Sequence, residues 1–369
     1  MDTSEKYYKN EKMNILIFGS RIIYGGGEKM LNWLAKRLIQ NGDNVIFATP
    51  NNNDEYRDKL EKVGLLGQVK IVEYPQYNKY KQLIRYYNGW KRIFKDNNID
   101  ILLIFGGSIV EQRAAHAENV KVVLSERWYP KARSFASQIL KQIQYKYADG
   151  YVFQTVEASK CYNKRAQRLS VIIPNPIIDN LPEAKTIERK EVVTVGRLAP
   201  EKNQGLVIKA FAIFSKNNPD HYLKIYGSGP LKTELLNLME SLQLSGKVEI
   251  IEGKRNISEL INGADLFVLP SNVEGMPNAL IEAMAMGITS ISTDCPAYGS
   301  RMLIQDGENG YLVPLDDVEK LAEAMNRAVR ESDRERIKNN SLKIRERLDA
   351  DKTADKWICY FKKILGITE

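Results

Sequence analysis

The sequence predicts an α/β protein made of two doubly wound parallel-sheet domains that face each other across a central cleft. At 369 residues the chain is long enough for two hydrophobic cores. Both halves alternate short apolar runs with amphipathic stretches, which is the pattern of parallel strands covered by helices. A polar, proline-containing linker at residues 177–191 separates the halves. The predicted domains are residues 1–183 and 184–350, followed by a final segment, residues 351–369.

Short apolar runs along the chain are the predicted strands. In the first half they are residues 14–20, 44–50, 69–75, 100–107, 121–126, 150–155 and 170–176. In the second half they are residues 191–196, 222–227, 248–253, 266–271 and 288–293. Ligands of open α/β sheets bind beyond the carboxyl ends of the strands, so the loops that follow these strands are where a site is expected.

Composition narrows the class of protein. The chain is 43% hydrophobic and 27% charged, as in an ordinary globular protein, and no apolar run approaches the ~18 residues of a membrane span. The polar N-terminus lacks the apolar centre of a signal peptide, so we expect a cytoplasmic protein. The cysteines at 161, 295 and 359 lie far apart without CxxC spacing, which argues against a zinc site or a disulfide framework.

The net charge of +8 lies entirely in the first half. Residues 1–183 hold 28 Lys and Arg against 19 Asp and Glu, and the remainder holds 26 against 27. The stretch Tyr77–Lys95 has six cations, no acid and several aromatic residues, and Lys131–Tyr147 adds four cations, again without an acid. This composition suits an anionic membrane surface, and equally nucleic acid or a solvated helix face over an aromatic core.

Glycines follow the first predicted strand, where Gly25, Gly26 and Gly27 precede a helix expected to begin near Glu28. Glycine lets the backbone approach a ligand closely, and a helix N-terminus favours anions. The spacing is neither that of a P-loop nor that of a GxGxxG fingerprint, so a plain flexible turn explains it equally well.

Two cations follow the first predicted strand of the second half, in the segment GRLAPEKN at residues 196–203. Arg197 ends the strand and Lys202 lies just inside a helix that Pro200 starts. By the strand-end rule they lie on the same rim as the GSGP segment at 227–230 and the segment 274–278. This convergence of glycine, cation and helix N-terminus predicts a diphosphate site.

The segment EGMPNALIEAMAMG, residues 274–287, holds the most specific spacing in the chain. A proline at the first position and a glycine past the last predict a short helix, residues 277–286. Its first backbone N–H groups favour an anion, and Glu282 lies about one turn deeper, within reach of a hydroxylated part of the same ligand. The N–H groups that would bind the anion belong to Gly275, Met276 and Asn278. Alternatively, Glu274 complements the helix dipole and Glu282 is solvated.

Several segments together resemble the retaining glycosyltransferases of family 4, which have the GT-B fold of two Rossmann-like domains. They are GRLAPEKN, IYGSGPLKTEL, ADLFVLPSNVEGMPNALIEAMAMGITSIST and DGENGYLV. The resemblance spans residues 14 to about 330 and is most specific over residues 191–313. Glu274 and Glu282 are similar to that family's two glutamates separated by seven residues.

The resemblance implies a role for each matching residue. Arg197, Lys202 and Glu274 would be catalytic, the two cations neutralising the donor diphosphate and Glu274 holding the transferred sugar. Glu282 would bind the ribose, and the segment Asp351–Leu365 would cross back to the first domain. The implied donor-binding set is Gly26, Gly27, Gly196, Arg197, Lys202, Gly227, Arg255, Ile257, Glu274, Gly275, Met276, Pro277, Asn278 and Glu282.

Such enzymes need no metal or other cofactor, which agrees with electrostatics. Cations and helix N-termini can stabilise the negative charge that develops on a leaving diphosphate. The D-x-D triplet Asp349–Asp351 begins the final helical stretch, and we interpret it as helix capping. The resemblance implies same-face attack with retention of configuration.

One departure concerns the first domain. Many members of the family have a histidine at the end of the strand that faces the sugar, whereas this chain has Ser125, Glu126 and Arg127 there. His116 lies nine residues earlier and is interpreted as a surface or packing residue. The SER triplet resembles members that assemble bacterial cell-surface polysaccharides on lipid-linked acceptors. Glu126 and Arg127 become candidates for acceptor or sugar contact, or else form a structural ion pair.

The sequence hypothesis is a metal-independent, retaining glycosyltransferase that moves a sugar from a nucleoside diphosphate sugar, favouring a UDP-sugar, to a hydroxyl of a lipid-linked or glycan acceptor. Its basic first domain is predicted to bind the inner face of an anionic membrane through Tyr77–Lys95. The alternatives are a UDP-sugar epimerase or a phosphorylase of the same fold, and a basic nucleic-acid-binding protein. The basic stretch lacks a recognisable nucleic-acid-binding motif.

Overall fold

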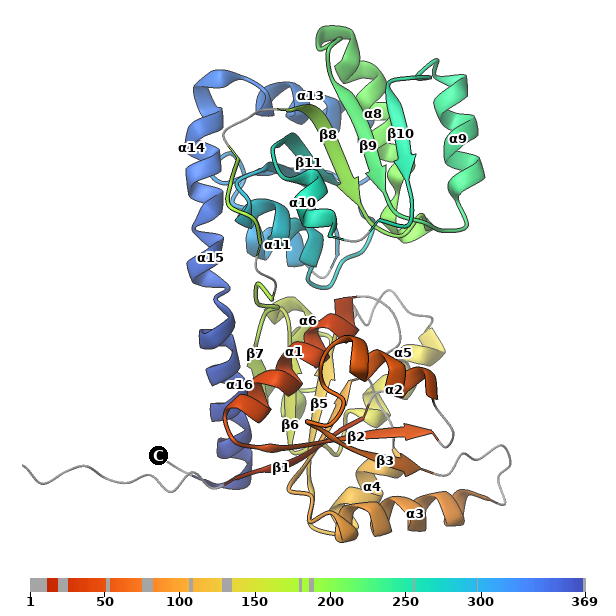
Figure 1. The fold of residues 1–369 in the computed structure, drawn as a ribbon, viewed down its shortest axis with the longest axis vertical. Coiled ribbons are helices and arrows are strands. Elements are labelled where there is room, and N and C mark those ends of the chain that lie inside the picture. The colour runs from red at the N-terminus through yellow and green to blue at the C-terminus, as the bar shows by residue number, and fades with distance from the viewer. Residues whose placement is uncertain are drawn as a thin grey trace, which may run out of the picture.

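The computed structural model describes residues 12–18, 26–50, 54–74, 82–105, 109–127, 135–178, 181–185, 189–254, 256–296 and 298–367. Figure 1 shows two α/β domains, one above the other, with helices α14 (Glu331–Leu342), α15 (Ile344–Arg347) and α16 (Ala350–Leu365) running along one side of both.

The first domain contains a parallel sheet in the order β3-β2-β1-β4-β5-β6-β7. Its strands are β1 (Asn14–Phe18), β2 (Asn44–Pro50), β3 (Lys70–Tyr74), β4 (Ile101–Phe105), β5 (Lys121–Glu126), β6 (Gly150–Phe153) and β7 (Ser170–Ile172). The helices are α1 (Gly26–Gln40), α2 (Asp54–Lys62), α3 (Leu83–Asp96), α4 (Val110–Ala117), α5 (Phe135–Gln144), α6 (Val156–Lys160) and α7 (Lys164–Arg168). All the strands predicted for this half are confirmed.

The second domain contains a parallel sheet in the order β10-β9-β8-β11-β12-β13. Its strands are β8 (Arg189–Val195), β9 (Tyr222–Tyr226), β10 (Val248–Ile251), β11 (Ala264–Leu269), β12 (Thr289–Thr293) and β13 (Tyr311–Val313). Its helices are α8 (Gln204–Asn217), α9 (Lys232–Ser241), α10 (Ile257–Ile261), α11 (Asn278–Ala285), α12 (Gly299–Leu303) and α13 (Val318–Ala328). The sequence reading missed β13, whose apolar run is too short to signal a strand, and β8 begins inside the predicted linker.

Each sheet has helices on both faces, so a hydrophobic cluster lies on each face of each sheet. In the first domain α1, α2 and α16 cover one face, and α3 and α4 cover the other. In the second domain α8 and α13 lie on one face, and α10, α11 and α15 on the other. This is the doubly wound arrangement that alternating apolar runs predict. None of the helices in the described residues combines the length and apolar character that crossing a bilayer requires.

Helix α16 packs on the first domain although the chain has just left the second. Trp357 and Phe361 are buried in the same cluster as residues of β1 and β4. The Tyr360 hydroxyl accepts a 2.8 Å hydrogen bond from the Tyr151 N–H and donates to the Leu169 carbonyl. Asp349 caps this helix by accepting from the Lys352 N–H at 2.9 Å, which confirms the capping interpretation of the D-x-D triplet.

The aromatic residues of the stretch Tyr77–Lys95 belong to the core. Tyr86, Trp90 and Phe94 are buried on the inner face of α3, where Trp90 stacks on Tyr74 with ring centroids 5.1 Å apart. They are therefore core residues, as in the alternative of a solvated helix over an aromatic core, and are not exposed to a membrane. Residues 77–81 of this stretch lie outside the described residues.

Candidate functional site

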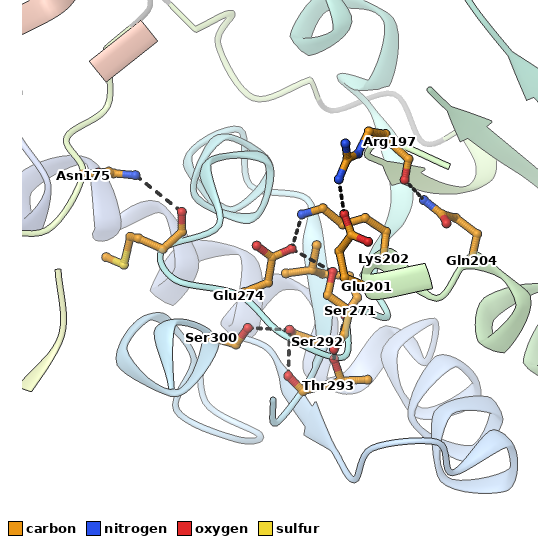
Figure 2. Close-up of polar contacts among 12 residues, drawn as sticks. Asn175, Arg197, Glu201, Lys202, Gln204, Ser271, Glu274, Ser292, Thr293 and Ser300 are labelled. Carbon is orange, nitrogen blue, oxygen red and sulfur yellow. Dashed lines mark hydrogen bonds and ion pairs between the residues drawn. The ribbon is translucent and has the colours of Figure 1, made fainter. Parts of the chain in front are cut away.

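The centre of the site is an ion pair between Lys202 and Glu274. The Lys202 Nζ lies 2.5 Å from the Glu274 Oε1, and the Ser271 hydroxyl donates to the same oxygen at 2.7 Å. Figure 2 shows both donors pointing at the same carboxylate oxygen. The Glu274 side chain is 11% exposed and that of Lys202 is 26% exposed. The sequence had assigned these residues separate tasks, and the structure brings them together.

A hydrogen-bonded turn places Lys202. Pro200–Lys202 form a 3-10 turn, and Asn203 follows in the left-handed conformation with φ 46°. The Asn203 amide donates to Asn272 at 2.9 Å, which fixes the turn against the loop that carries Glu274. The Lys202 side chain is therefore presented to Glu274 by the turn rather than by a long helix.

Arg197 is directed away from this centre. Its guanidinium pairs with Glu201, and its side chain is 67% exposed. Figure 2 shows Arg197 beside Glu201 at the edge of the group. Arg197 therefore lies on the predicted rim but does not converge with Lys202 in this conformation.

Two glycines make the close approach that their loops require. A Cβ added to Gly227 would lie 1.9 Å from the Gly196 carbonyl oxygen, so these strand ends fit together without a side chain. A Cβ on Gly275 would lie 2.8 Å from the Arg127 carbonyl oxygen and 3.0 Å from the Gln154 side chain. Gly275 is thus a point of close contact between the second domain and the first.

Helix α11 begins at Asn278 and ends at Ala285, with Pro277 as its N-cap residue. The helix predicted at residues 277–286 is confirmed to within one residue at each end. The Asn278 side chain accepts a 2.6 Å hydrogen bond from Asn175 of the first domain, which also donates to the Met276 carbonyl at 3.4 Å. The start of α11 therefore directly faces the first domain.

Glu282 faces the first domain and is not a solvated residue. Its carboxylate pairs with Lys29 of α1 at 2.7 Å and accepts from Ser258 at 3.3 Å. The Glu282 side chain is 21% exposed. Lys29 lies two and three residues after Gly27 and Gly26, which form the first turn of α1. The glycine-bearing helix start and the second glutamate of the motif are thus joined across the cleft.

Glu126 is a structural residue of the first domain. It is 3% exposed, pairs with Lys141 at 3.0 Å and accepts hydrogen bonds from Tyr145 at 3.1 Å and Tyr162 at 2.8 Å. This burial does not fit the predicted contact with an acceptor or sugar. The ion pair of Glu126 is with Lys141 and not, as the alternative supposed, with Arg127.

Arg127 connects the first domain, α16 and the site. Its guanidinium lies over the rings of Phe105 and Trp357, 5.2 Å and 5.4 Å from their centroids, and donates to Asn175 at 3.0 Å. Burial lowers the pKa of this guanidinium to about 9. The Asn175 oxygen also accepts from Gln154 at 2.7 Å, so Arg127 helps to orient the amide that contacts α11.

The remaining predicted residues lie around this centre or outside the described part. Ile257 begins the short helix α10, next to Ser258. Gly25 and Arg255 lie outside the described residues. Cys295 is fully buried, and burial together with the charge of Glu274 raises the pKa of its thiol to about 11. The thiol near the Glu274 carboxylate, that of Cys295, is therefore un-ionised at neutral pH.

The chain resembles known proteins, both within its second domain and over most of its length. The second domain matches the family of glycosyl transferases group 1, over residues 178–344. The chain is 25% identical over 311 residues to an uncharacterized glycosyltransferase of Haemophilus influenzae, covering 82% of this chain and 86% of that protein. It is 24% identical over 349 residues to an alpha-1,4-N-acetyl-D-galactosaminyltransferase of Campylobacter jejuni, covering 90% and 94% respectively.

The solved structure of Anabaena HepE in complex with UDP superimposes with a TM-score of 0.81 at 17% identity, covering 95% of this chain and 100% of that one. The fold is therefore GT-B, and the comparisons support a glycosyltransferase. The group 1 match includes Arg197, Lys202, Glu274 and Glu282, whereas Lys29 and Asn175 lie before it in the chain.

Lys29, Gln154, Asn175, Ser258 and Ser271 are site residues that the sequence analysis did not name. Gln154, Asn175 and Ser271 are among the last two residues of predicted strands, whereas Lys29 lies in α1 and Ser258 in α10. Attention to polar residues at the carboxyl ends of the predicted strands would have found Gln154, Asn175 and Ser271. Nothing in the sequence pairs Lys29 with Glu282, since 253 residues separate them.

Proposed function

We propose that the chain is a metal-independent, retaining glycosyltransferase of family 4 that transfers a sugar from UDP-sugar to a hydroxyl of a lipid-linked acceptor in cell-surface polysaccharide synthesis. The observation that carries the proposal is the Lys202–Glu274–Ser271 group at the N-terminal side of α11, facing the first domain. The Campylobacter relative is named for transfer to a diNAcBac-PP-undecaprenol glycan, and HepE was solved with UDP.

The chemistry at Lys202 follows from charge. Breaking the bond between the sugar and the diphosphate leaves negative charge on the leaving oxygen. The Lys202 ammonium has three donors, so it can keep its contact with Glu274 and also reach a phosphate oxygen. The first N–H groups of α11 add their partial positive charge at the same place. These groups provide the stabilisation that a divalent cation would otherwise supply.

The two glutamates would act on hydroxyl groups. A carboxylate only accepts hydrogen bonds, and hydroxyls of a sugar or a ribose donate them. Glu274 lies beside Lys202 and would hold the transferred sugar, while Glu282 lies little more than two turns along the same segment and would hold the ribose. Donor binding then requires the ribose to share or displace the Lys29 contact with Glu282.

Calorimetric titration of UDP, GDP and ADP into the metal-free protein tests the donor site. We expect UDP to bind most tightly, and Lys202→Ala and Glu282→Ala each to weaken UDP binding about tenfold or more, because each removes a charge-assisted hydrogen bond worth ~1.5–3 kcal/mol. The matched controls Lys209→Ala and Glu240→Ala remove exposed side chains of α8 and α9 and should bind UDP unchanged. Binding of none of the nucleotides, or equal loss in the controls, would contradict the proposal.

Turnover tests the reaction. UDP release from UDP-sugars, measured with and without EDTA, should be unaffected by the chelator. The anomeric configuration of the product, determined by NMR, should match that of the donor. Loss of activity with EDTA that added Mg²⁺ restores would contradict metal independence, and an inverted product would contradict retention.

A further inference from the structure

Helix α5 carries a cation toward the protein interior and its largest aliphatic side chains toward solvent. Lys141 and Tyr145 are buried, where both contact Glu126. On the opposite side Ile139, Leu140 and Ile143 are 47%, 50% and 47% exposed. The spacing of three and four residues puts these three on one face of the helix. An amphipathic helix of a water-exposed domain normally has the reverse arrangement.

The exposed face continues past the end of the helix. Tyr147 is 42% exposed and lies one turn beyond Ile143. Arg113 of α4 lies 5.8 Å and Lys146 5.5 Å from the centre of the Tyr147 ring. We define Ile139, Leu140, Ile143 and Tyr147 as the α5 ridge. It combines aliphatic side chains, an aromatic residue with a polar end, and flanking cations.

The charges around the α5 ridge indicate which kind of surface it binds. Residues 135–148 contain no Asp or Glu, so nothing on this segment repels an anionic surface. Aliphatic residues backed by Tyr, Lys and Arg are the composition of helices that lie in the headgroup region of anionic bilayers. We propose that the α5 ridge docks this protein on the surface of an anionic lipid bilayer. The cations favour an anionic bilayer over an uncharged surface, and the three adjacent aliphatic side chains favour a lipid surface.

A chain of contacts links the helix that carries the α5 ridge to the segment 274–278 of the second domain. Lys141 and Tyr145 anchor α5 to Glu126, the last residue of β5, and the next residue, Arg127, has its carbonyl against Gly275. Figure 1 shows α5 in the half of the first domain that is nearer the second domain, with α3 at the opposite end. Docking through α5 therefore sets the cleft near the lipid surface, which docking through α3 does not.

This inference deepens the proposed function, because a lipid-linked acceptor would be presented at the bilayer surface. It also relocates the membrane contact predicted from the stretch Tyr77–Lys95. The exposed cations of α3 can add long-range attraction, but α3 presents a single strongly exposed aliphatic side chain, Ile84, whereas α5 presents three on one face.

Co-sedimentation of the full chain with vesicles tests the proposal. The protein should sediment with vesicles of phosphatidylcholine and phosphatidylglycerol, less with phosphatidylcholine alone, and less as salt is raised. The triple variant Ile139→Ser, Leu140→Ser, Ile143→Ser should weaken vesicle binding at least about tenfold, since each residue loses about three methylene-sized groups. A matched control replaces three exposed aliphatic residues of the second domain, Ile213→Ser, Leu236→Ser and Leu315→Ser, and should bind as the original does.

A second variant avoids the apolar residues. Lys146→Glu reverses one exposed charge next to Tyr147 and should lower affinity for the anionic vesicles while leaving the weak binding to phosphatidylcholine unchanged. Vesicle binding that is unaffected in the triple variant, or reduced equally in the control triple, would overturn the proposal. So would a dimer that the triple variant converts to a monomer while neither protein binds vesicles, because the ridge would then be occupied by a second copy.

UDP titration of the same proteins separates this proposal from the proposed function. The triple variant should keep the UDP affinity of the original chain, because the ridge makes no contact with the Lys202–Glu274 centre. Loss of vesicle binding with intact UDP binding supports the ridge. Failure of every protein to bind UDP would contradict the donor site and leave the vesicle result standing.

Discussion

At the residue scale, both acids of the EGMPNALIE segment are paired with lysines from elsewhere in the chain. Glu274 takes Lys202 of the same domain, and Glu282 takes Lys29 of the other domain. Each lysine lowers the cost of holding a carboxylate at a half-buried position. Each carboxylate is therefore held in place by a charged partner before any ligand arrives.

Replacing Glu274 should separate turnover from nucleotide binding. Glu274→Gln removes the charge that holds Lys202 and replaces one of the two acceptor oxygens with an NH2 group that only donates. We expect UDP release from the donor to fall about 100-fold, the typical effect of losing one directed electrostatic contact in a reaction centre. UDP affinity should not fall, because Lys202 loses a competing anion.

The measurement is UDP release together with calorimetric UDP titration, with Glu240→Gln as the exposed control. Turnover at the original rate, or UDP affinity that falls tenfold, would show that Glu274 does not have this role.

Thiol reactivity reports the environment behind Glu274. The pKa of about 11 leaves the Cys295 thiol only about 0.1% ionised at pH 8, and the side chain is fully buried. Cys359 is exposed on α16. Under native conditions a maleimide should label Cys359 at least about 100-fold faster than Cys295. Mass spectrometry of the labelled peptides, with a Cys359→Ser control, checks this. Rapid labelling of Cys295 would mean that its pocket opens readily.

At the element scale, the loops after the strands determine how closely the domains approach. Gly275 leaves no room for a side chain beside the Arg127 carbonyl, and a Cβ on Gly299 at the start of α12 would lie 1.9 Å from the Gly275 carbonyl. Gly205, inside α8, has its nearest neighbour 3.7 Å from an added Cβ. Alanine should therefore be tolerated at Gly205 and not at Gly275 or Gly299.

Donor turnover tests this difference. Gly275→Ala should lower the rate of UDP release about tenfold or more, because the first domain and the 274–278 loop must move apart. Gly205→Ala should leave the rate unchanged and slightly raise the thermal midpoint, since alanine favours helix by ~1 kcal/mol. Unchanged turnover in Gly275→Ala would show that the domains do not need this contact.

Helix α16 contributes a large part of the first-domain core. Trp357→Ala should destabilise the protein by about 3–5 kcal/mol through the cavity that it leaves. Denaturant unfolding followed by circular dichroism measures the loss, and Lys356→Ala on the exposed side of the same helix is the control. A loss below ~1 kcal/mol would show that α16 is only loosely attached.

The elements were predictable to the extent that periodicity encodes them. The apolar runs of β1 to β12 stand between polar turns, so their positions followed from the sequence, and β13 did not because only three residues form it. The aromatic residues of α3 could not be assigned from the sequence, because a stretch of Tyr, Trp and Lys is compatible with a membrane-binding face and with a buried core face. The structure shows that they pack against β1 and β3 in the core. Lys202 and Glu274 were predictable as strand-end residues, but their direct pairing depends on the left-handed turn at Asn203.

At the scale of the whole molecule, several contacts join the domains among the described residues. They include the Lys29–Glu282 ion pair, the hydrogen bonds of Asn175 to Asn278 and to the Met276 carbonyl, and the approach of Gly275 to Arg127. These contacts lie on the loops and helices that follow the strand ends, where the donor is proposed to bind. Sequence reasoning placed these segments on facing rims, but only the three-dimensional arrangement identifies which side chains meet.

Alkaline pH should destabilise the whole molecule through its buried tyrosines. Burial, with nearby Glu111, raises the pKa of Tyr74 to about 12, and burial raises that of Tyr360 to about 12. Burial and nearby Glu126 also raise the pKa of Tyr145 and Tyr162. In the unfolded chain these phenols lose their protons near pH ~10. Their contribution to stability is therefore complete below pH ~10 and is lost as pH rises toward 12.

Arg127 and Arg347 act in the opposite direction, because burial lowers the pKa of both guanidinium groups and this adds stability as pH rises. They are outnumbered, because burial also raises the pKa of Tyr56, Tyr86, Tyr151 and Tyr226. The thermal midpoint should fall by about 5 °C or more between pH 9.5 and 11, with tyrosinate absorbance appearing only on unfolding. A flat midpoint together with tyrosinate in the folded protein would show that these phenols are not shielded.

The return of α16 to the first domain has a consequence for synthesis on the ribosome. The first domain is translated before the second, yet Trp357, Tyr360 and Phe361, which complete its core, are translated only after the second domain. The second domain, closed by α15, has all its residues before that point. Once residues 1–349 have left the exit tunnel of the ribosome, the second domain is complete and the first domain still has an open apolar face. That face is exposed to chaperones until α16 has also left the tunnel.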